Sequence, residues 1–154
     1  MYRGSVRIVF LLASLNDIDI FTCDIVDAYL NAKCREKFWT EAGTYFGTEK
    51  GMVMIIAIAL YGLKSSGAAW RGKLAENLML VGYKSSEADS YVWMKQDFKT
   101  NGYPYYKYML HYVDDLLYIF FKPKEDMDAL NTIYRLKKGF GPPYRYLGVN
   151  VEKV

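Results

Sequence analysis

The sequence is poor in the residues that build many metal and redox sites. Its 154 residues include two cysteines, Cys23 and Cys34, and a single histidine, His111. Neither cysteine lies in a spacing typical of zinc ligands, and one histidine cannot complete a Cys/His zinc set. We therefore expect two buried, reduced thiols in an intracellular protein, and for His111 a place in a strand with no catalytic role.

Long apolar runs are also missing. The runs IVFLLASL (residues 8–15) and MVMIIAIAL (52–60) are far shorter than the ~20 residues needed to cross a bilayer. Two arginines precede the first run, but no small-residue cleavage site follows it, which argues against a signal peptide. The sequence therefore predicts an intracellular protein, cytoplasmic or nuclear, with no membrane partner.

No charge of one sign dominates. The net charge is +3, from 20 basic and 17 acidic residues, which permits an anionic partner such as nucleic acid without requiring one. Half of the residues are apolar, enough for a core, and the length predicts one compact domain. The sequence makes no prediction of oligomeric state.

Hydrophobic periodicity predicts a mixture of helices and strands. Helices are expected over residues 5–15, 65–83 and 124–140, and strands over 18–26, 37–41, 53–60, 89–96, 105–113, 116–121 and 144–154. Ser5 is expected to cap the first helix. The inner residues should be Val6, Val9, Phe10 and Ala13 in the first helix and Met127, Leu130, Ile133, Tyr134 and Leu136 in the last. This order predicts an α+β fold with a largely antiparallel sheet packed against helices.

Two adjacent aspartates interrupt the apolar stretch HYVDDLLY at residues 111–118. Because burying two like charges is very costly, we expect a hairpin whose tight turn carries Asp114 and Asp115 outward. Such a turn alone is an ordinary structural feature. Asp24 and Asp27 also lie in an apolar stretch, and carboxylates at strand ends can converge on Mg²⁺. Two such ions ~3.5–4 Å apart can clamp a phosphoryl transfer.

Four motifs occur in a fixed order along the chain: DIVDAYLNA (24–32), ALYGLKSSGAAW (59–70), YVDD (112–115) and YRYLGV (144–149). Together they resemble the reverse transcriptase domain of copia-type LTR retrotransposons, and the similarity covers nearly the whole chain. The resemblance implies a right-hand polymerase palm with a catalytic YVDD hairpin. It also implies that residues 1–154 form a single palm domain, with most of the fingers, the thumb and RNase H absent.

The implied activity is that of an RNA-directed DNA polymerase. It would transfer dNTPs onto a primer 3′-hydroxyl paired to an RNA or DNA template, using two Mg²⁺ ions with Mn²⁺ as a substitute. Family motifs assign metal binding to Asp24, Asp114 and the backbone carbonyl of Ile25, and a catalytic role also to Asp115. The nucleotide-binding set is Asp27, Ala28, Gly62 and Tyr29, the last as a steric gate against a 2′-hydroxyl. The primer and template set is Tyr112, Val113, Lys64, Leu147 and Gly148.

Departures from the family pattern leave an alternative open. Ile55 and Ile58 replace lysines, and Gly67–Ala68 replaces a Pro-Arg pair, so positive charge is lost where nucleic acid would lie. The alternative is an inactive, truncated transposon remnant that acts, if at all, as a binding module. Because primer positioning supplies much of a polymerase's rate, we expect weak or no activity from this chain alone. Four further lysines are expected to be solvated charges: Lys122, Lys124, Lys137 and Lys138.

Overall fold

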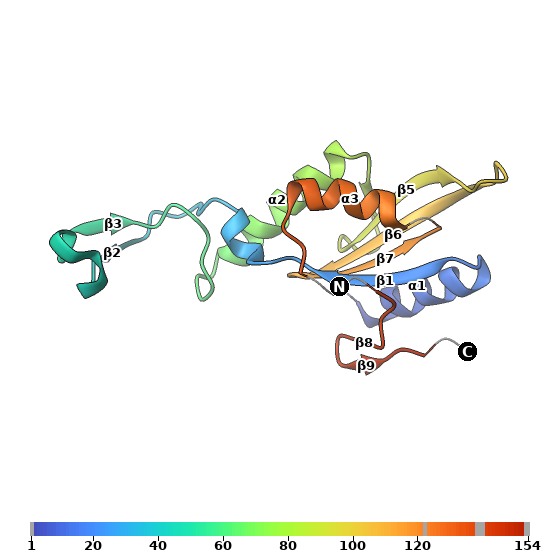
Figure 1. The fold of residues 1–154 in the computed structure, drawn as a ribbon, viewed down its shortest axis with the longest axis horizontal. Coiled ribbons are helices and arrows are strands. Elements are labelled where there is room, and N and C mark those ends of the chain that lie inside the picture. Colours follow the sequence, from blue (N-terminus) through green and yellow to red (C-terminus); the bar gives the residue numbers. More distant parts are fainter. Residues whose placement is uncertain (1, 122, 138–140, 153–154) are drawn as a thin grey trace. The chain divides into compact units, whose positions relative to one another are not determined.

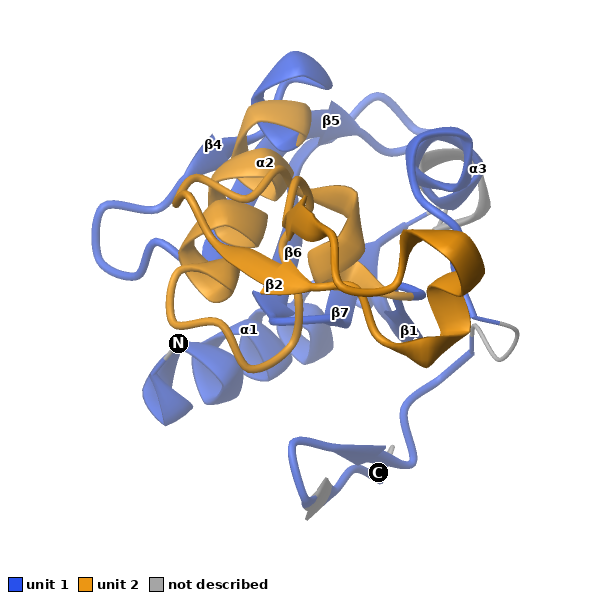
Figure 2. Ribbon diagram, turned by 90° about the vertical axis from the view of Figure 1, so that its left-hand side faces the viewer, with its two compact units in different colours: residues 1–26, 78–154 blue, residues 27–77 orange. Residues whose placement is uncertain are grey.

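The computed structural model describes residues 2–121, 123–137 and 141–152. The chain falls into two compact units (Figure 2). The first comprises residues 1–26 and 78–154, and the second comprises residues 27–77. The first unit contains the main sheet, and the second contains a two-stranded ribbon and most of one helix.

The main sheet of the first unit has five antiparallel strands in the order β1-β7-β6-β5-β4 (Figure 1). They are β1 (Asp19–Asp24), β4 (Lys84–Ser85), β5 (Val92–Phe98), β6 (Pro104–Tyr112) and β7 (Asp115–Phe120). Residues 116–120 of β7 are all fully buried. This strand is covered on both faces, which explains why its sequence is continuously apolar rather than alternating. The predicted α+β class with an antiparallel sheet is confirmed.

Helix α1 (Arg3–Leu15) packs on the sheet through the face that the sequence predicts. Val9 and Ala13 are buried in a core with Leu117 and Ile119 of β7, and Val6 and Phe10 pack half-buried against it. The predicted cap is wrong, because the helix begins at Arg3 and Ser5 lies inside it.

The N-terminus of α1 is capped by Asp89, a residue more than 80 positions away in the sequence. Its Oδ2 accepts hydrogen bonds from the Tyr2 backbone N–H at 2.8 Å and from Ser5 Oγ at 2.7 Å. The first turn of α1 contains no acidic residue of its own. The Asp89 carboxylate therefore supplies the negative charge that favours a helix N-terminus.

Helix α3 (Pro123–Ile133) ends earlier than predicted. Met127, Leu130 and Tyr134 are buried as expected, whereas Ile133 is 40% exposed. Beyond the helix, the chain runs beside the end of β1, where Leu136 forms an antiparallel bridge with Ile25. Backbone hydrogen bonds to β1 thus replace the helical bonds that periodicity alone predicts, and residues 138–140 lie outside the described ranges.

The C-terminal segment is a hairpin, not the single strand that the sequence predicts. Strands β8 (Arg145–Tyr146) and β9 (Val149–Asn150) pair in antiparallel register. Leu147 and Gly148 form the two-residue turn with φ of 46° and 82°. Positive φ at both turn positions matches the twist of a tight hairpin, and Gly148 adopts it without strain.

The second unit contains a ribbon of β2 (Trp39–Glu41) and β3 (Val53–Ile55), with short 3₁₀ helices η1 (Ala28–Asn31) and η2 (Thr44–Glu49). Helix α2 (Ser66–Leu80) begins in this unit and ends in the first. The strand predicted over residues 53–60 is too long. After Ile55 the backbone leaves β2 and pairs instead with residues 32–34, through hydrogen bonds from Cys34 N–H to Ala57 O and from Ala59 N–H to Ala32 O.

The two thiols are free. Cys23 is buried as predicted, but Cys34 is only half-buried, and its thiol donates to the Glu36 carbonyl. None of the helices in the described ranges has the length and apolar character needed to span a membrane.

Candidate active site

Asp24 and Asp115 meet at one end of the main sheet. Asp24 is the last residue of β1, Asp115 is the first of β7, and the two are direct cross-strand partners. Side chains of directly opposed residues lie on the same face of a sheet. Tyr112, the last residue of β6, is the partner of Asp115 on its other side. Two aspartates 91 positions apart in the sequence therefore form one carboxylate pair beside a tyrosine.

The hairpin turn between β6 and β7 consists of Val113 and Asp114. The prediction that both aspartates occupy the turn is therefore wrong for Asp115, which is a strand residue. The Asp114 carbonyl accepts a hydrogen bond from Ile25 N–H at 2.9 Å, which ties the turn to the continuation of β1. Val113 has φ of 57°, an unfavourable conformation for a β-branched residue. The turn is thus held in a strained form at the point where the carboxylates converge.

The carboxylates of this site repel one another. Burial raises the pKa of the Asp115 carboxyl above its usual value, and the charges of Asp114 and Asp24 raise it further, while Lys137 partly opposes them. A carboxyl with two like charges nearby is easier to protonate. The same charge arrangement attracts cations.

Lys137 contacts this site directly. Its Nζ lies 2.5 Å from Asp24 Oδ2. The side chain is exposed, as predicted for a solvated charge, but its ion pair with Asp24 was not predicted. The hydrogen bond with Asp24 is the main cause of a raised pKa for Lys137, and the charges of Asp114 and Asp115 add to it. No motif in the sequence marks this lysine, because it lies 113 positions from Asp24. Only the backbone pairing of residues 135–137 with β1 brings it there.

A carboxylate oxygen of Asp24 has no hydrogen-bond donor among the described residues. Asp24 Oδ1 is buried and accepts no hydrogen bond from the part of the chain that the structure describes. A buried carboxylate oxygen without a donor is costly unless a cation is near. Carboxylate oxygens are the ligands that Mg²⁺ prefers, so the residues present fit a divalent cation.

Within the described ranges, no three His, Cys, Asp or Glu side chains form a ready metal cluster. Mg²⁺ in proteins is often held by one or two carboxylates together with waters and substrate phosphates. The carboxylates gathered at this end of the sheet are those of Asp24, Asp114 and Asp115.

A small cavity of about 220 Å³ opens at the carboxylates. Besides Asp24 and Asp115, its walls include two basic side chains, Lys137 and Arg145. No motif in the sequence marks Arg145, which lies in β8. Tyr146 and Leu147 of the C-terminal hairpin also line it.

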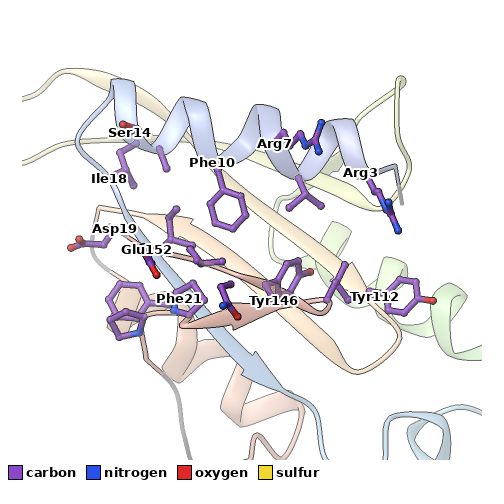
Figure 3. Close-up of a pocket in the computed structure, with 18 of the residues that line it drawn as sticks. Arg3, Arg7, Phe10, Ser14, Ile18, Asp19, Phe21, Tyr112, Tyr146 and Glu152 are labelled. Atoms are coloured by element: carbon purple, nitrogen blue, oxygen red, sulfur yellow. The ribbon is translucent and has the colours of Figure 1, made fainter. Parts of the chain in front are cut away.

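A larger groove of about 1340 Å³ lies between α1, β1 and the β8–β9 hairpin (Figure 3). Tyr112, Leu147 and Gly148, three of the five residues predicted to hold primer and template, line it. Arg3 and Arg7 of α1 line it as well, and Figure 3 shows Arg3 and Tyr112 toward the same end. The other two predicted residues fall elsewhere: Val113 is not part of this lining, and Lys64 is an exposed residue of the second unit.

The residues predicted to bind the nucleotide lie in the second unit. Tyr29 stacks near Tyr61, with ring centroids 4.5 Å apart, and Gly62 follows with φ of 96°. Ala28 is fully buried, and the Asp27 carbonyl accepts the Leu30 N–H. The structure therefore brings residues 27–32 and 59–70 together within this unit, while the role of these residues stays a prediction.

Comparison with known proteins gives one family and one named relative. The family model described as "Reverse transcriptase (RNA-dependent DNA polymerase)" matches residues 2–154. The "Retrovirus-related Pol polyprotein from transposon TNT 1-94" of Nicotiana tabacum is 26% identical over 157 residues. The match covers 97% of this chain but 11% of the relative, so the chain spans about a tenth of that protein's length. No solved structure matches the chain.

Proposed function

Since this chain belongs to the reverse transcriptase (RNA-dependent DNA polymerase) family and is of the copia type, we propose that it extends a primer 3′-hydroxyl with dNTPs on an RNA or DNA template. The observation that carries this proposal is the direct pairing of Asp24 with Asp115 beside the Asp114 turn. Family membership does not favour the alternative of a non-enzymatic binding module.

Asp24 and Asp114, with the backbone carbonyl of Ile25, are the proposed metal ligands, and Asp115 is their neighbour. Two Mg²⁺ ions, or Mn²⁺ in their place, would lower the pKa of the primer hydroxyl and stabilise the leaving pyrophosphate. The orphaned Oδ1 of Asp24 supports this assignment, because the oxygen has no donor among the described residues. The carboxylates act as ligands and orient the reacting groups, which is the main catalytic contribution in phosphoryl transfer.

The finer fold assignment is a palm domain of a right-hand polymerase, spanning residues 1–154. An antiparallel sheet with helices and a hairpin that carries carboxylates at one sheet end supports it. Within this domain, Asp27, Ala28, Tyr29 and Gly62 would bind the incoming nucleotide. The Tyr29 ring would stack under the deoxyribose and exclude a 2′-hydroxyl.

The groove beside α1 is the proposed place of the primer end. Its lining combines an aromatic ring, Tyr112, with the turn of Leu147 and Gly148 and the cations of Arg3 and Arg7. Arginines hold phosphate oxygens, and aromatic rings stack on bases without sequence preference. Val113 and Lys64 do not line this groove, so their proposed contacts with primer and template are supported by the family resemblance alone.

Primer extension tests the proposed function. Wild-type chain and the Asp114→Asn variant are incubated with poly(rA)/oligo(dT), labelled dTTP and Mg²⁺. Substituting groups that only orient metal ligands costs 10–100-fold, so losing a ligand should reduce incorporation by more than about 100-fold. Asp128→Asn, which changes an exposed aspartate of α3, is the matched control and should retain wild-type incorporation. Because activity of this chain alone is expected to be weak, the wild-type signal should be small. Incorporation that survives Asp114→Asn would contradict the proposal, and no incorporation by either protein would favour the inactive remnant.

A further inference from the structure

Lys137 is held beside Asp24 by two separate contacts. The Lys137 backbone N–H donates to the Asp24 carbonyl at 2.8 Å, and the Lys137 ammonium donates to Asp24 Oδ2. Neighbouring backbone bonds fix the same segment, since Val26 N–H donates to Arg135 O at 2.8 Å and Thr22 N–H to Gly141 O at 3.0 Å. The lysine side chain therefore starts directly opposite the aspartate, and the backbone around it is already in place for the ion pair.

The ammonium occupies a position in which a divalent cation would compete with it. It binds one oxygen of Asp24 while the other oxygen, Oδ1, has no donor within the described residues. Asp114 and Asp115 both act on Lys137 electrostatically, so the ammonium lies in the field of all three carboxylates. A monovalent charge at that point neutralises part of the repulsion that the carboxylates would otherwise feel.

The ion pair is also exposed enough to open. The side chain of Lys137 is 52% exposed and that of Asp24 is 32% exposed. Exposed lysine–carboxylate pairs contribute little net stability, because water screens the attraction and the long side chain loses freedom. A divalent cation with its stronger field can therefore displace the ammonium without disrupting the fold.

We propose that Lys137 is a displaceable internal counter-ion of the candidate metal site, which masks Asp24 until a divalent cation takes its place. The proposal rests on the proposed function, because it takes Asp24 and Asp114 as the metal ligands. It assigns to Lys137 a regulatory role that the motifs of the sequence do not indicate. The site is then self-inhibited at low metal concentration, and its metal affinity is set partly by how readily the lysine leaves.

Direct Mn²⁺ binding tests this role without any need for polymerase activity. The free Mn²⁺ signal is followed by electron paramagnetic resonance while metal is added to the wild type, Lys137→Met and Arg145→Met. Methionine keeps most of the side-chain length but removes the ammonium. Arg145 lines the same cavity, so its substitution removes a nearby positive charge while leaving the Lys137–Asp24 contact in place.

We expect Lys137→Met to bind Mn²⁺ about 3- to 10-fold more tightly than the wild type, and Arg145→Met to show a clearly smaller change. Adding Asp24→Asn to Lys137→Met should abolish this tight binding, which locates the metal. Equal tightening in the two single variants would reduce the effect to general charge and overturn the proposal. Unchanged Mn²⁺ affinity in Lys137→Met would also overturn the proposal. So would the absence of Mn²⁺ binding in both the wild type and Lys137→Met.

Two further measurements distinguish a wrong counter-ion proposal from a misfolded variant and from a wrong polymerase proposal. Thermal unfolding of each variant confirms that it is folded, and Lys137→Gln replaces Lys137→Met if the latter is not. If Lys137→Met binds Mn²⁺ more tightly but the wild type does not extend primers, the counter-ion proposal is supported and the polymerase proposal is contradicted. If the wild type extends primers but Lys137→Met binds Mn²⁺ no more tightly, the polymerase proposal is supported and the counter-ion proposal is contradicted.

Discussion

Asp24 and Asp115 stand directly opposite each other across β1 and β7, with no residue between them in the register. Like charges in directly opposed positions destabilise a sheet by a few tenths to about 1 kcal/mol. The strand ends nevertheless place both carboxylates on one face, and the Val113–Asp114 turn adds a third. Such an arrangement weakens the fold at the proposed cation site, a trade-off that active sites often show.

Removing one of the two opposed charges should therefore stabilise the metal-free protein. We expect Asp115→Asn to raise the free energy of unfolding by roughly 0.5 kcal/mol at neutral pH, because the amide keeps the shape and loses the repulsion. The melting temperature should rise by about 1–3 °C. Asp128→Asn, on the exposed side of α3, serves as the control and should leave the melting temperature unchanged. A lower melting temperature for Asp115→Asn would show that the repulsion is not a dominant effect.

Asp89 links two distant parts of the first unit, and its loss should destabilise α1. The carboxylate is buried and accepts hydrogen bonds from Tyr2 N–H, Ser5 Oγ and Tyr91 N–H. Hydrogen bonds to charged groups are worth about 1.5–3 kcal/mol each, but losses at one site do not add, so Asp89→Ala should cost about 2–3 kcal/mol in total. Chemical denaturation measures this change in the free energy of unfolding. The control is Glu87→Ala, at an exposed position two residues away, which should leave the free energy of unfolding unchanged.

The same carboxylate predicts how this stability depends on pH. Burial acts to raise the pKa of Asp89, but the hydrogen bonds from Tyr2, Ser5 and Tyr91 outweigh it and lower the pKa below the usual 3.8. A lowered pKa in the folded state gives stability that is complete above about pH 4 and is lost as the pH falls through the folded pKa. The gap between wild type and Asp89→Ala should therefore be constant from pH 5 to 7 and shrink below pH 4. A gap that widens in acid would contradict this assignment.

Local patterns in the sequence were sufficient for most of the sheet. The continuously apolar run at 116–120 predicts a buried strand, and these residues form most of β7 with no exposed surface. The face of α1 followed from its 3.6-residue periodicity. The convergence of Asp24 with the Asp114–Asp115 pair was an expectation from motif order, and the register supplies it.

Features that depend on long-range hydrogen bonds were missed. α3 stops at Ile133 because the following residues pair with the end of β1, which no local pattern predicts. The same backbone hydrogen bonds also place Lys137 beside Asp24. The same reasoning applies to Ser5, which satisfies the local rule for a helix cap but bonds to Asp89 instead. In each case a partner more than 80 positions away overrides the local preference.

Arg3 and Arg7 line the groove proposed for the primer, so nucleic-acid binding there should depend on salt concentration. Each phosphate contact neutralised by an arginine contributes a slope of about −0.7 to −0.9 to the logarithm of affinity against the logarithm of salt concentration. The double variant Arg3→Gln/Arg7→Gln should bind a template–primer duplex more weakly and with a slope less steep by about 1–2. Fluorescence anisotropy at several salt concentrations measures both. The control is a double variant of two exposed lysines that are not part of the groove lining, Lys73→Gln/Lys84→Gln, which has the same net charge and should change the slope less.

The two thiols should differ sharply in reactivity. Burial raises the pKa of Cys23 to about 12; the nearby Asp24 and Asp115 charges act in the same direction, and a hydrogen bond with Tyr118 partly opposes them. Only the thiolate is an effective nucleophile, so Cys23 is almost entirely protonated at pH 8. Cys34 is half-buried, and no comparable burial protects it.

A disulfide exchange reagent at pH 8 should therefore titrate one thiol per native chain within minutes and the second only after unfolding in guanidinium. Cys34→Ser should remove the fast reaction and leave one thiol that reacts on unfolding. Since Cys23 lies directly before Asp24 in β1, its protection also reports whether the strand end at the carboxylates stays closed. Rapid reaction of both thiols in the native chain would mean that this end of β1 opens readily, and the register that pairs Asp24 with Asp115 would then not be the stable state.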